Sequence, residues 1–210
     1  MIVDMSPESQ HWPDAHIAMA QDADAGAMDD GSADDADMRA VAGGDWQAFS
    51  RLVSRHHRMV WRVAVGILND QTDAEDVAQE AFLKLRDAAP RYVPAGKFRP
   101  FLYQIVTRLC LDRLRKRRTC SLSEVAELSS NAPDLVETLH QQERDRLVHE
   151  AIASLPMNQR IAVVLRYFEG CGYRDIAATL HISDKAAERL LARARQSLEG
   201  RLASKISGKP

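Results

Sequence analysis

Apolar residues recur at helical spacing along most of the chain, and no segment alternates apolar and polar residues as a half-buried strand would. The clearest helix follows Asp45, a candidate N-cap, where apolar residues repeat three and four positions apart from Trp46 to Ile67. The tripeptide "NDQ" then interrupts this pattern. We therefore expect an all-α fold.

Two further helices complete a first domain, which we expect over residues 38–118. In "TDAE", Thr72 and Glu75 have the spacing of a capping box, which predicts a helix from there to Arg86. A loop rich in proline follows, and the next helix is expected over residues 101–118.

The second half of the chain predicts another small helical domain. Residues 119–138 are polar, contain several serines and Pro133, and are expected to form a flexible linker. The second domain is expected over residues 139–202, followed by a tail over 203–210. Its helical segments are 141–155, 157–168, 173–180 and 183–202. The expected architecture is therefore two small helical domains joined by a flexible linker.

Charge is distributed unevenly along the chain. The net charge is −2, but the first 40 residues hold nine Asp and one Glu against one Arg, which leaves +7 for the remainder. A basic body suggests an anionic partner. Residues 1–37 show no apolar periodicity and are expected to be a disordered acidic tail, either a solvating segment or a decoy that competes with nucleic acid. Met28 and Met38 are alternative starts.

Composition argues against several classes of protein. Cys110, Cys120 and Cys171 form no C-x-x-C pair, which disfavours a disulfide framework or a zinc site and fits a reducing compartment. No apolar run is long enough to span a membrane, and the N-terminus lacks the pattern of a secretory signal. Neither nucleophile–base spacing, metal-ligand spacing nor a glycine-rich phosphate loop is found. We expect a cytoplasmic protein that is not an enzyme and needs no cofactor.

The last two helical segments have the pattern of a helix-turn-helix. His181 stands in the turn, where a left-handed residue is needed, and histidine is enriched in that conformation. Ser183 can cap the second helix, whose apolar stripe leaves the opposite face to Lys185, Arg189 and Arg193. Such a face can enter the major groove of DNA, although an ordinary helical hairpin with a solvated basic face has the same pattern.

The segment 91–118 combines aromatic and basic residues. Between Arg108 and Arg118 there are six cations and one Asp. Before this run, Tyr92, Phe98 and Phe101 are interleaved with cations, as in proteins that hold unstacked bases. Core packing is the alternative for each single aromatic residue.

The helix that follows Thr72 has an acidic stripe formed by Asp73, Asp76 and Glu80, beside Gln79. Such a stripe is usually only a solvated face. Because carboxylates repel nucleic acid, a functional role for this face would be the binding of another protein.

Together these segments resemble bacterial sigma factors of the extracytoplasmic function group, within the sigma-70 family. The likeness lies in four stretches that occur in the family's order, "DAEDVAQEAFLKL", "FLYQIVTRLCLDRLRKRR", "SLPMNQRIAVVLRYFEGCGYRDIAATLHIS" and "KAAERLLARARQSL". It covers residues 38–202, where the first domain is similar to sigma region 2 and the second to region 4. The resemblance implies a transcription initiation factor that directs core RNA polymerase to promoters.

The resemblance also implies roles for particular residues of the first domain. Asp76, Gln79 and Glu80 would contact the clamp helices of the largest polymerase subunit. The loop over residues 88–97 would capture a flipped base of the −10 promoter element, and the helix after it would hold the melting strand. The residues implied for this −10 surface are Arg91, Tyr92, Lys97, Phe98, Arg99, Phe101, Arg108, Arg113, Arg115, Lys116, Arg117 and Arg118.

The second domain would read the −35 element with its helix-turn-helix and touch the polymerase flap. The residues implied for the −35 contact are Arg174, Ser183, Lys185, Glu188, Arg189 and Arg193. The linker, with Glu124, Glu127, Asp134 and Glu137, would thread along the catalytic cleft. An anti-sigma factor is a further expected partner. The alternative is a stand-alone helix-turn-helix regulator of duplex DNA, which leaves the acidic helix and the aromatic loop unexplained.

Several positions depart from the family's pattern. Phe101 stands where the family often has Trp, Arg108 replaces an Asn, and His181 replaces the usual glycine of the turn. Ala-Ala-Glu, ending at Glu188, replaces a frequent Thr-Val-Lys run and suggests a subgroup. Glu188 is expected either to form an ion pair with Lys185 or to accept a hydrogen bond from the N4 amine of a cytosine.

Overall fold

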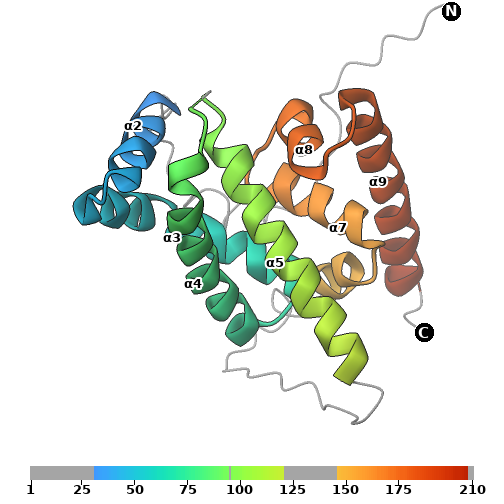
Figure 1. The fold of residues 1–210 in the computed structure, drawn as a ribbon. Helices are drawn as coiled ribbons and strands as arrows, with labels where there is room; N and C mark the ends of the chain where they lie inside the picture. The colour runs from blue at the N-terminus through green and yellow to red at the C-terminus, as the bar shows by residue number, and fades with distance from the viewer. Residues whose placement is uncertain (1–30, 95, 121–145, 208–210) are drawn as a thin grey trace, which may run out of the picture.

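The computed structural model describes residues 31–94, 96–120 and 146–207, and every regular element in these ranges is helical. In Figure 1, helices α2, α3 and α4 lie on one side and α7, α8 and α9 on the other, with the long helix α5 between them. The elements are α2 (Gly31–Ala42), α3 (Trp46–Leu68), α4 (Gln71–Ala88), the 3-10 turn η1 (Ala89–Arg91), α5 (Phe98–Cys120), an unlabelled helix over residues 146–153, α7 (Met157–Val163), the π-helical segment η2 (Val164–Phe168), α8 (Tyr173–Leu180) and α9 (Asp184–Ser207). The expected all-α fold is confirmed.

The N-terminus of α3 forms as its sequence predicts. The carboxylate of Asp45 accepts hydrogen bonds from the backbone N–H groups of Gln47 and Ala48 at 2.8 and 3.2 Å. These bonds satisfy two of the donors that a helix leaves unpaired in its first turn. Asp45 is therefore the N-cap of α3.

The boundary between α3 and α4 is set by two adjacent polar residues. Asn69 ends α3 in the left-handed region, with φ of 54°, and Asp70 caps α4 by accepting from the N–H of Asp73 at 2.9 Å. The capping box predicted at Thr72 is wrong, because Asp70 already satisfies the first turn and leaves Thr72 inside it. Helix α4 also continues two residues past Arg86.

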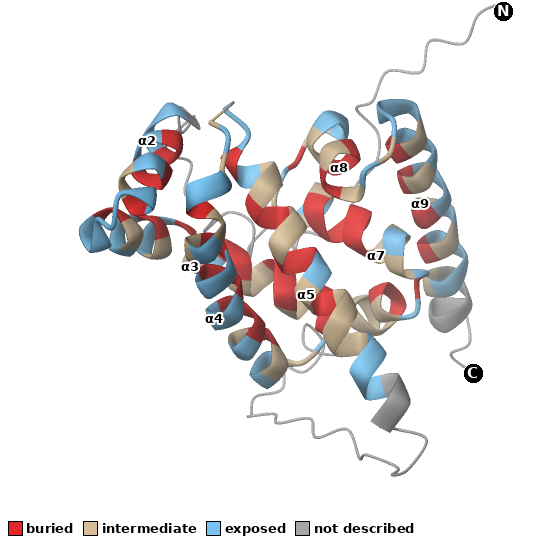
Figure 2. Cartoon of the chain, in the orientation of Figure 1, coloured by how far each residue is buried: buried red, intermediate tan, exposed pale blue. Residues whose placement is uncertain are grey.

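The core of the first domain lies between the apolar faces of α3, α4 and α5, the red segments of Figure 2. Val77, Ala81 and Leu85 are buried on α4, as the helical spacing predicts. Other fully buried residues are Leu52, Ile67, Phe98, Leu102 and Tyr103.

Helix α2 corrects the predicted extent of the acidic tail. Residues 31–37 are expected in that tail, whereas the structure has them in α2. The buried side of this helix carries Asp34, Asp35 and Asp37 as well as Met38, so hydrophobic periodicity alone does not reveal it. Residues 1–30 lie outside the described part of the chain.

The second domain forms a smaller core between α7, α8 and α9. Helix α7 runs directly into η2, so the helix predicted over residues 157–168 forms with a change of winding in its second half. Fully buried residues here include Ile161, Leu165, Ile176, Leu191 and Leu198. Most of the predicted linker, residues 121–138, falls outside the described residues.

The two domains pack against each other, which the sequence does not predict. Arg62 of α3 forms two hydrogen bonds with Glu169, both 2.9 Å long, and Gln104 of α5 donates to the carbonyl of Ala178 at 2.8 Å. Gly66 permits the close approach of α3 to η2, because a Cβ there would lie 2.9 Å from a methyl group of Val164. The structure therefore holds the domains in a closed arrangement.

Candidate nucleic-acid and polymerase interfaces

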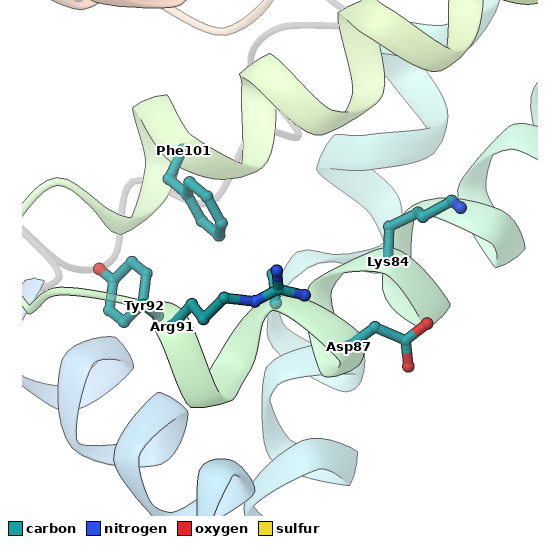
Figure 3. Close-up of a pocket in the computed structure, with 6 residues that line it drawn as sticks. Lys84, Asp87, Arg91, Tyr92 and Phe101 are labelled. Carbon is teal, nitrogen blue, oxygen red and sulfur yellow. The ribbon is translucent and has the colours of Figure 1, made fainter.

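A pocket of about 420 Å³ lies where the end of α4, η1 and the start of α5 meet (Figure 3). The rings of Tyr92 and Phe101 give it an apolar side, with centroids 5.2 Å apart and planes inclined by 49°. Lys84 and Arg91 bring cations to the same place. Aromatic rings beside cations can stack an unpaired base and contact its phosphate.

The geometry of Tyr92 is fixed by its neighbours. Its hydroxyl donates a hydrogen bond of 2.5 Å to Asp35, and its ring meets that of Phe98 edge-on, with centroids 6.3 Å apart. Burial and the carboxylate of Asp35 raise the pKa of Tyr92 well above its usual range. The hydroxyl therefore remains a donor at neutral pH.

Phe98 is a correction to the predicted −10 surface. Its side chain is only 1% exposed, and its ring packs 4.9 Å from the ring of His56. It faces inward at the first turn of α5, so it belongs to the core and presents no face to a base.

The other predicted residues around the pocket are accessible. Arg91 and the half-buried Tyr92 and Phe101 line it, whereas Lys97, Arg99 and Arg108 are exposed on the adjoining loop and on α5. The sequence reasoning missed two more lining residues, Lys84 and Asp87. Lys84 lies four positions after Glu80, the last residue of the predicted acidic stripe, and Asp87 lies three positions after Lys84, so continuing that face toward the end of α4 reveals both.

The basic end of α5 is partly paired within the molecule. Arg113 forms ion pairs with Asp76 and, at 3.2 Å, with Asp73. Arg117 pairs with Asp70 at 2.6 Å and with Asp73. These two arginines, predicted to contact DNA, therefore fasten α5 to the first two turns of α4 and its cap.

Three cations of this run remain, Arg115, Lys116 and Arg118. Arg115 is exposed and pairs with Asp112 at 3.2 Å, and Lys116 is exposed on the same turn. Arg118 lies in α5, but its side chain is not among those described. Arg115 and Lys116 therefore stay candidates for phosphate contacts.

The capping residue of α4 is a stable anion. Hydrogen bonds from the N–H of Asp73 and from Arg117 hold the pKa of Asp70 below its usual range, against the opposing effect of burial. Asp70 is therefore ionised at neutral pH and pairs with Arg117 there, where the predicted acidic and basic faces meet.

The predicted protein-binding face of α4 is exposed. Asp76, Gln79 and Glu80 all lie at the surface. Leu83, which the sequence reasoning missed, continues this face and is 49% exposed. An apolar residue three positions after Glu80 on a polar face is the signal that identifies it. An exposed leucine beside polar side chains can supply apolar area to a contact with another protein.

The helix-turn-helix geometry agrees with the sequence prediction. His181 ends α8 in the left-handed region, with φ of 53°, and the hydroxyl of Ser183 accepts from the N–H of Ala186 at 3.2 Å. The buried stripe of α9 contains Ala187, Leu191, Ala194 and Leu198. The turn and the orientation of α9 are therefore confirmed.

All six residues predicted to read duplex DNA are exposed. They are Arg174, Ser183, Lys185, Glu188, Arg189 and Arg193. Within the described part of the chain, Glu188 forms no ion pair with Lys185. One of the two expected roles of Glu188 is therefore not seen, and its carboxylate is accessible to a partner.

The buried cysteines have the character of core residues. Cys110 and Cys171 are free thiols, and burial raises the pKa of Cys110 to about 12 and that of Cys171 to about 11. Both are protonated at neutral pH and are poor nucleophiles. Among the described residues, no cluster of His, Cys, Asp or Glu fits a metal ion, and no helix has the length and apolarity to cross a membrane.

Family models match both halves of the chain. Residues 52–119 match sigma-70 region 2, and residues 145–198 match sigma-70 region 4. The first match contains the pocket and the acidic face, and the second contains the helix-turn-helix.

Curated relatives agree with these matches. The chain is 33% identical over 77% of its length to a probable RNA polymerase sigma factor, RfaY, of Xanthomonas campestris, but it spans only 42% of that protein. It is 31% identical over 77% of its length to the ECF RNA polymerase sigma factor SigM of Mycobacterium tuberculosis, of which it spans 80%.

Two solved structures have the same fold. The structure of CnrH in complex with the cytosolic domain of CnrY matches 82% of this chain and 98% of that one, with 27% identity and a TM-score of 0.63. The sigma factor RpoE of Bartonella quintana, in complex with the anti-sigma factor NepR, matches 74% of this chain and 96% of that one, with 22% identity and a TM-score of 0.61. The chain belongs to the extracytoplasmic function group of the sigma-70 family.

Proposed function

We propose that this protein is a transcription initiation factor that binds core RNA polymerase and directs it to promoters with specific −10 and −35 elements. It assists promoter melting but is not itself an enzyme, since the polymerase carries out catalysis, and it acts in the cytoplasm. The observation that carries the proposal is the pocket of Tyr92 and Phe101, which is also lined by two cations, Lys84 and Arg91. A protein that reads only duplex DNA has no need of a site for an unstacked base.

Core polymerase binds to the exposed face of α4. Asp76, Gln79 and Glu80 supply the polar rim, and Leu83 supplies apolar area. The clamp helices of the largest subunit are the proposed partner. The ion pairs of Arg113 and Arg117 hold this face in place by fixing α4 to α5.

The pocket at the end of α4 captures a base of the melted −10 element. Phe101 and Tyr92 stack on the base, while Lys84 and Arg91 neutralise the phosphates beside it. Lys97, Arg99, Arg108, Arg115 and Lys116 extend this basic surface along the loop and α5. Capture of a flipped base stabilises the melted state over the duplex.

The second domain reads the −35 element through α9. Lys185, Arg189 and Arg193 contact phosphates and base edges from the exposed side of this helix, and Arg174 contacts the backbone from α8. Glu188 accepts a hydrogen bond from a cytosine amine in the major groove. Ser183 has a double role as cap and backbone contact.

An anti-sigma factor is the proposed regulatory partner. Both similar solved structures are complexes, one with the cytosolic domain of CnrY and the other with the anti-sigma factor NepR. The exposed faces of α4 and α9 are surfaces that such a partner can cover.

Promoter binding with and without core polymerase tests the proposal. A DNA fragment selected by the reconstituted holoenzyme should be bound tightly and specifically only when core polymerase is present. The same fragment should show permanganate-reactive thymines in its −10 region. Tight, specific binding by the protein alone, with no melting when polymerase is added, would favour the stand-alone regulator.

A further inference from the structure

Helix α2 buries three carboxylates against the first domain. Asp34, Asp35 and Asp37 are 1%, 5% and 7% exposed. A buried carboxylate is costly unless it is paired or hydrogen-bonded, so the partners of each residue show what it holds in place.

Two of these carboxylates hold α2 on α3. Asp34 pairs with Arg55 and accepts from Nε2 of His56 at 2.9 Å. Asp37 pairs with Arg51 at 2.6 Å and with Arg55 at 3.3 Å. These contacts join α2 to α3, and Met38 adds apolar packing from the same helix.

Asp35 is bonded to a different part of the molecule. One of its oxygens accepts from the hydroxyl of Tyr92 at 2.5 Å, and the other accepts from the backbone N–H of Gly96 at 2.9 Å. The two donors lie on either side of Pro94. A single carboxylate thus fixes the loop between η1 and α5 at two points, and Gly96 reaches this geometry with φ of +62°.

The contact with Tyr92 orients a ring that lines the pocket. The Tyr92 ring lies 5.2 Å from the ring of Phe101, so a rotation of Tyr92 would change the space between them. Helix α2 lies beside η1 and this loop (Figure 1). The chain before α3 is therefore linked directly to the pocket.

We propose that Asp35 is a positioning residue for base capture: it holds Tyr92 and the loop through Gly96 in the geometry that accepts the flipped −10 base. This inference rests on the proposed role of the pocket. Asp35 itself does not contact DNA. Replacing Asp35 should therefore slow promoter opening only when a base enters the pocket. A residue that merely stabilises the fold would not show this dependence on the base.

The test combines Asp35→Asn with removal of the captured base. Open-complex formation is timed with holoenzyme on a promoter that the wild-type holoenzyme selects, and on copies with one abasic site at each −10 position in turn. The captured position is the one at which the abasic site slows the wild-type protein most. Asp35→Asn should slow opening about 10-fold on the intact promoter, the effect of one hydrogen bond to a charged group. On the abasic template Asp35→Asn should slow opening less than about 2-fold, because the base that the pocket would hold is missing.

Two further variants keep the result interpretable. Tyr92→Phe keeps the ring and leaves Asp35 unchanged, and it should reproduce the template-dependent defect without adding to that of Asp35→Asn in the double variant. Asp37→Asn removes the same charge from the same helix but has its partners in α3, so any slowing should be equal on both templates. Circular dichroism and core-polymerase affinity check that each variant is folded.

The outcomes separate this inference from the proposed function. Equal slowing by Asp35→Asn on intact and abasic templates, or no slowing on either, would overturn the role of Asp35 alone. If no abasic position slows the wild-type protein, base capture by the pocket fails, and the role of Asp35 fails with it.

Discussion

At the scale of single residues, the buried carboxylates of α2 are paired or hydrogen-bonded. Burial acts to raise the pKa of Asp34, but the bonds from His56 and Arg55 outweigh it and hold that pKa below its usual range. Asp34 therefore contributes stability as an anion. A group with a lowered folded pKa stabilises the protein above its unfolded pKa, near 3.9 for Asp, and loses this contribution as pH falls through the folded value.

The variant Asp34→Asn should be less stable than the wild-type protein by about 2 kcal/mol at pH 7, because one charged acceptor of two hydrogen bonds is lost. The difference should shrink as the pH falls below about 4, the unfolded pKa of Asp, and then through the lower pKa of the folded carboxylate. Urea unfolding at several pH values measures both effects. Asp112→Asn is the control, since its pair with Arg115 is exposed and should contribute less than about 1 kcal/mol. A difference that is constant across this pH range would contradict the account.

Glu188 is the residue most directly tied to promoter choice. It is exposed on α9 and forms no pair with Lys185 in the described structure, so its carboxylate can accept from a base. Glu188→Gln should change preference at one base pair of the −35 element by about 10-fold and leave the other positions unchanged. Selection of promoters from a randomised −35 library measures this. Glu199→Gln, on the same helix, is the control. An unchanged profile at every position would mean that Glu188 contacts no base.

At the scale of helices, the polar residues at their ends and faces decide the arrangement. Asn69 and Asp70 end one helix and start the next, and the acidic first turn of α4 then binds the basic end of α5. The face of α4 that remains exposed carries Leu83 among polar residues.

Replacing Leu83 with Asp should weaken binding to core polymerase about 10-fold, because an apolar contact is lost and a charge is introduced on the face. The thermal unfolding temperature should not fall, since Leu83 is half exposed. Ser54→Asp, which introduces the same charge at an exposed position of α3, is the control and should bind normally. Affinity measured with labelled core polymerase checks the prediction, and equal affinities for both variants would exclude Leu83 from the interface.

Hydrophobic periodicity predicts most helices of this protein, and the errors have physical causes. The position of α9 and the left-handed His181 follow from local pattern and backbone preference. Helix α2 is missed because its buried side is acidic, and Phe98 is misplaced because a motif of aromatics and cations does not say which ring faces the core. The burial of α2 depends on Arg55 and His56, and that of Phe98 on His56, and the local sequence does not reveal these tertiary partners.

At the scale of the whole molecule, the two domains are closed on each other. The carboxylate of Glu169 is 1% exposed and is held by Arg62, while Gly66 lies against Val164. Burial raises the pKa of Glu169, against the pull of Arg62. Because the proposed clamp and flap contacts lie on different parts of the polymerase, we expect this interface to open when core polymerase binds.

Fluorescence energy transfer between labels at Ser50 in α3 and Gln196 in α9 measures the opening. Transfer should be high in the free protein and should fall on addition of core polymerase. Gly66→Leu should lower it without polymerase, since the new side chain cannot fit against Val164, while α3 itself gains helix propensity. Gly200→Leu, where no neighbour lies within 4 Å of the added Cβ, is the matched control. Transfer that is unaffected by polymerase would mean that the domains act as one closed unit.

The central claim is that this protein gives core RNA polymerase its choice of promoters. Transcription of fragmented genomic DNA in vitro, with core polymerase and the purified protein, followed by mapping of the 5′ ends, tests it most directly. We expect a small set of discrete start sites that share two short motifs at a fixed spacing. These starts should be absent with core polymerase alone and strongly reduced with Leu83→Asp. A pattern of starts identical to that of core polymerase alone would contradict it.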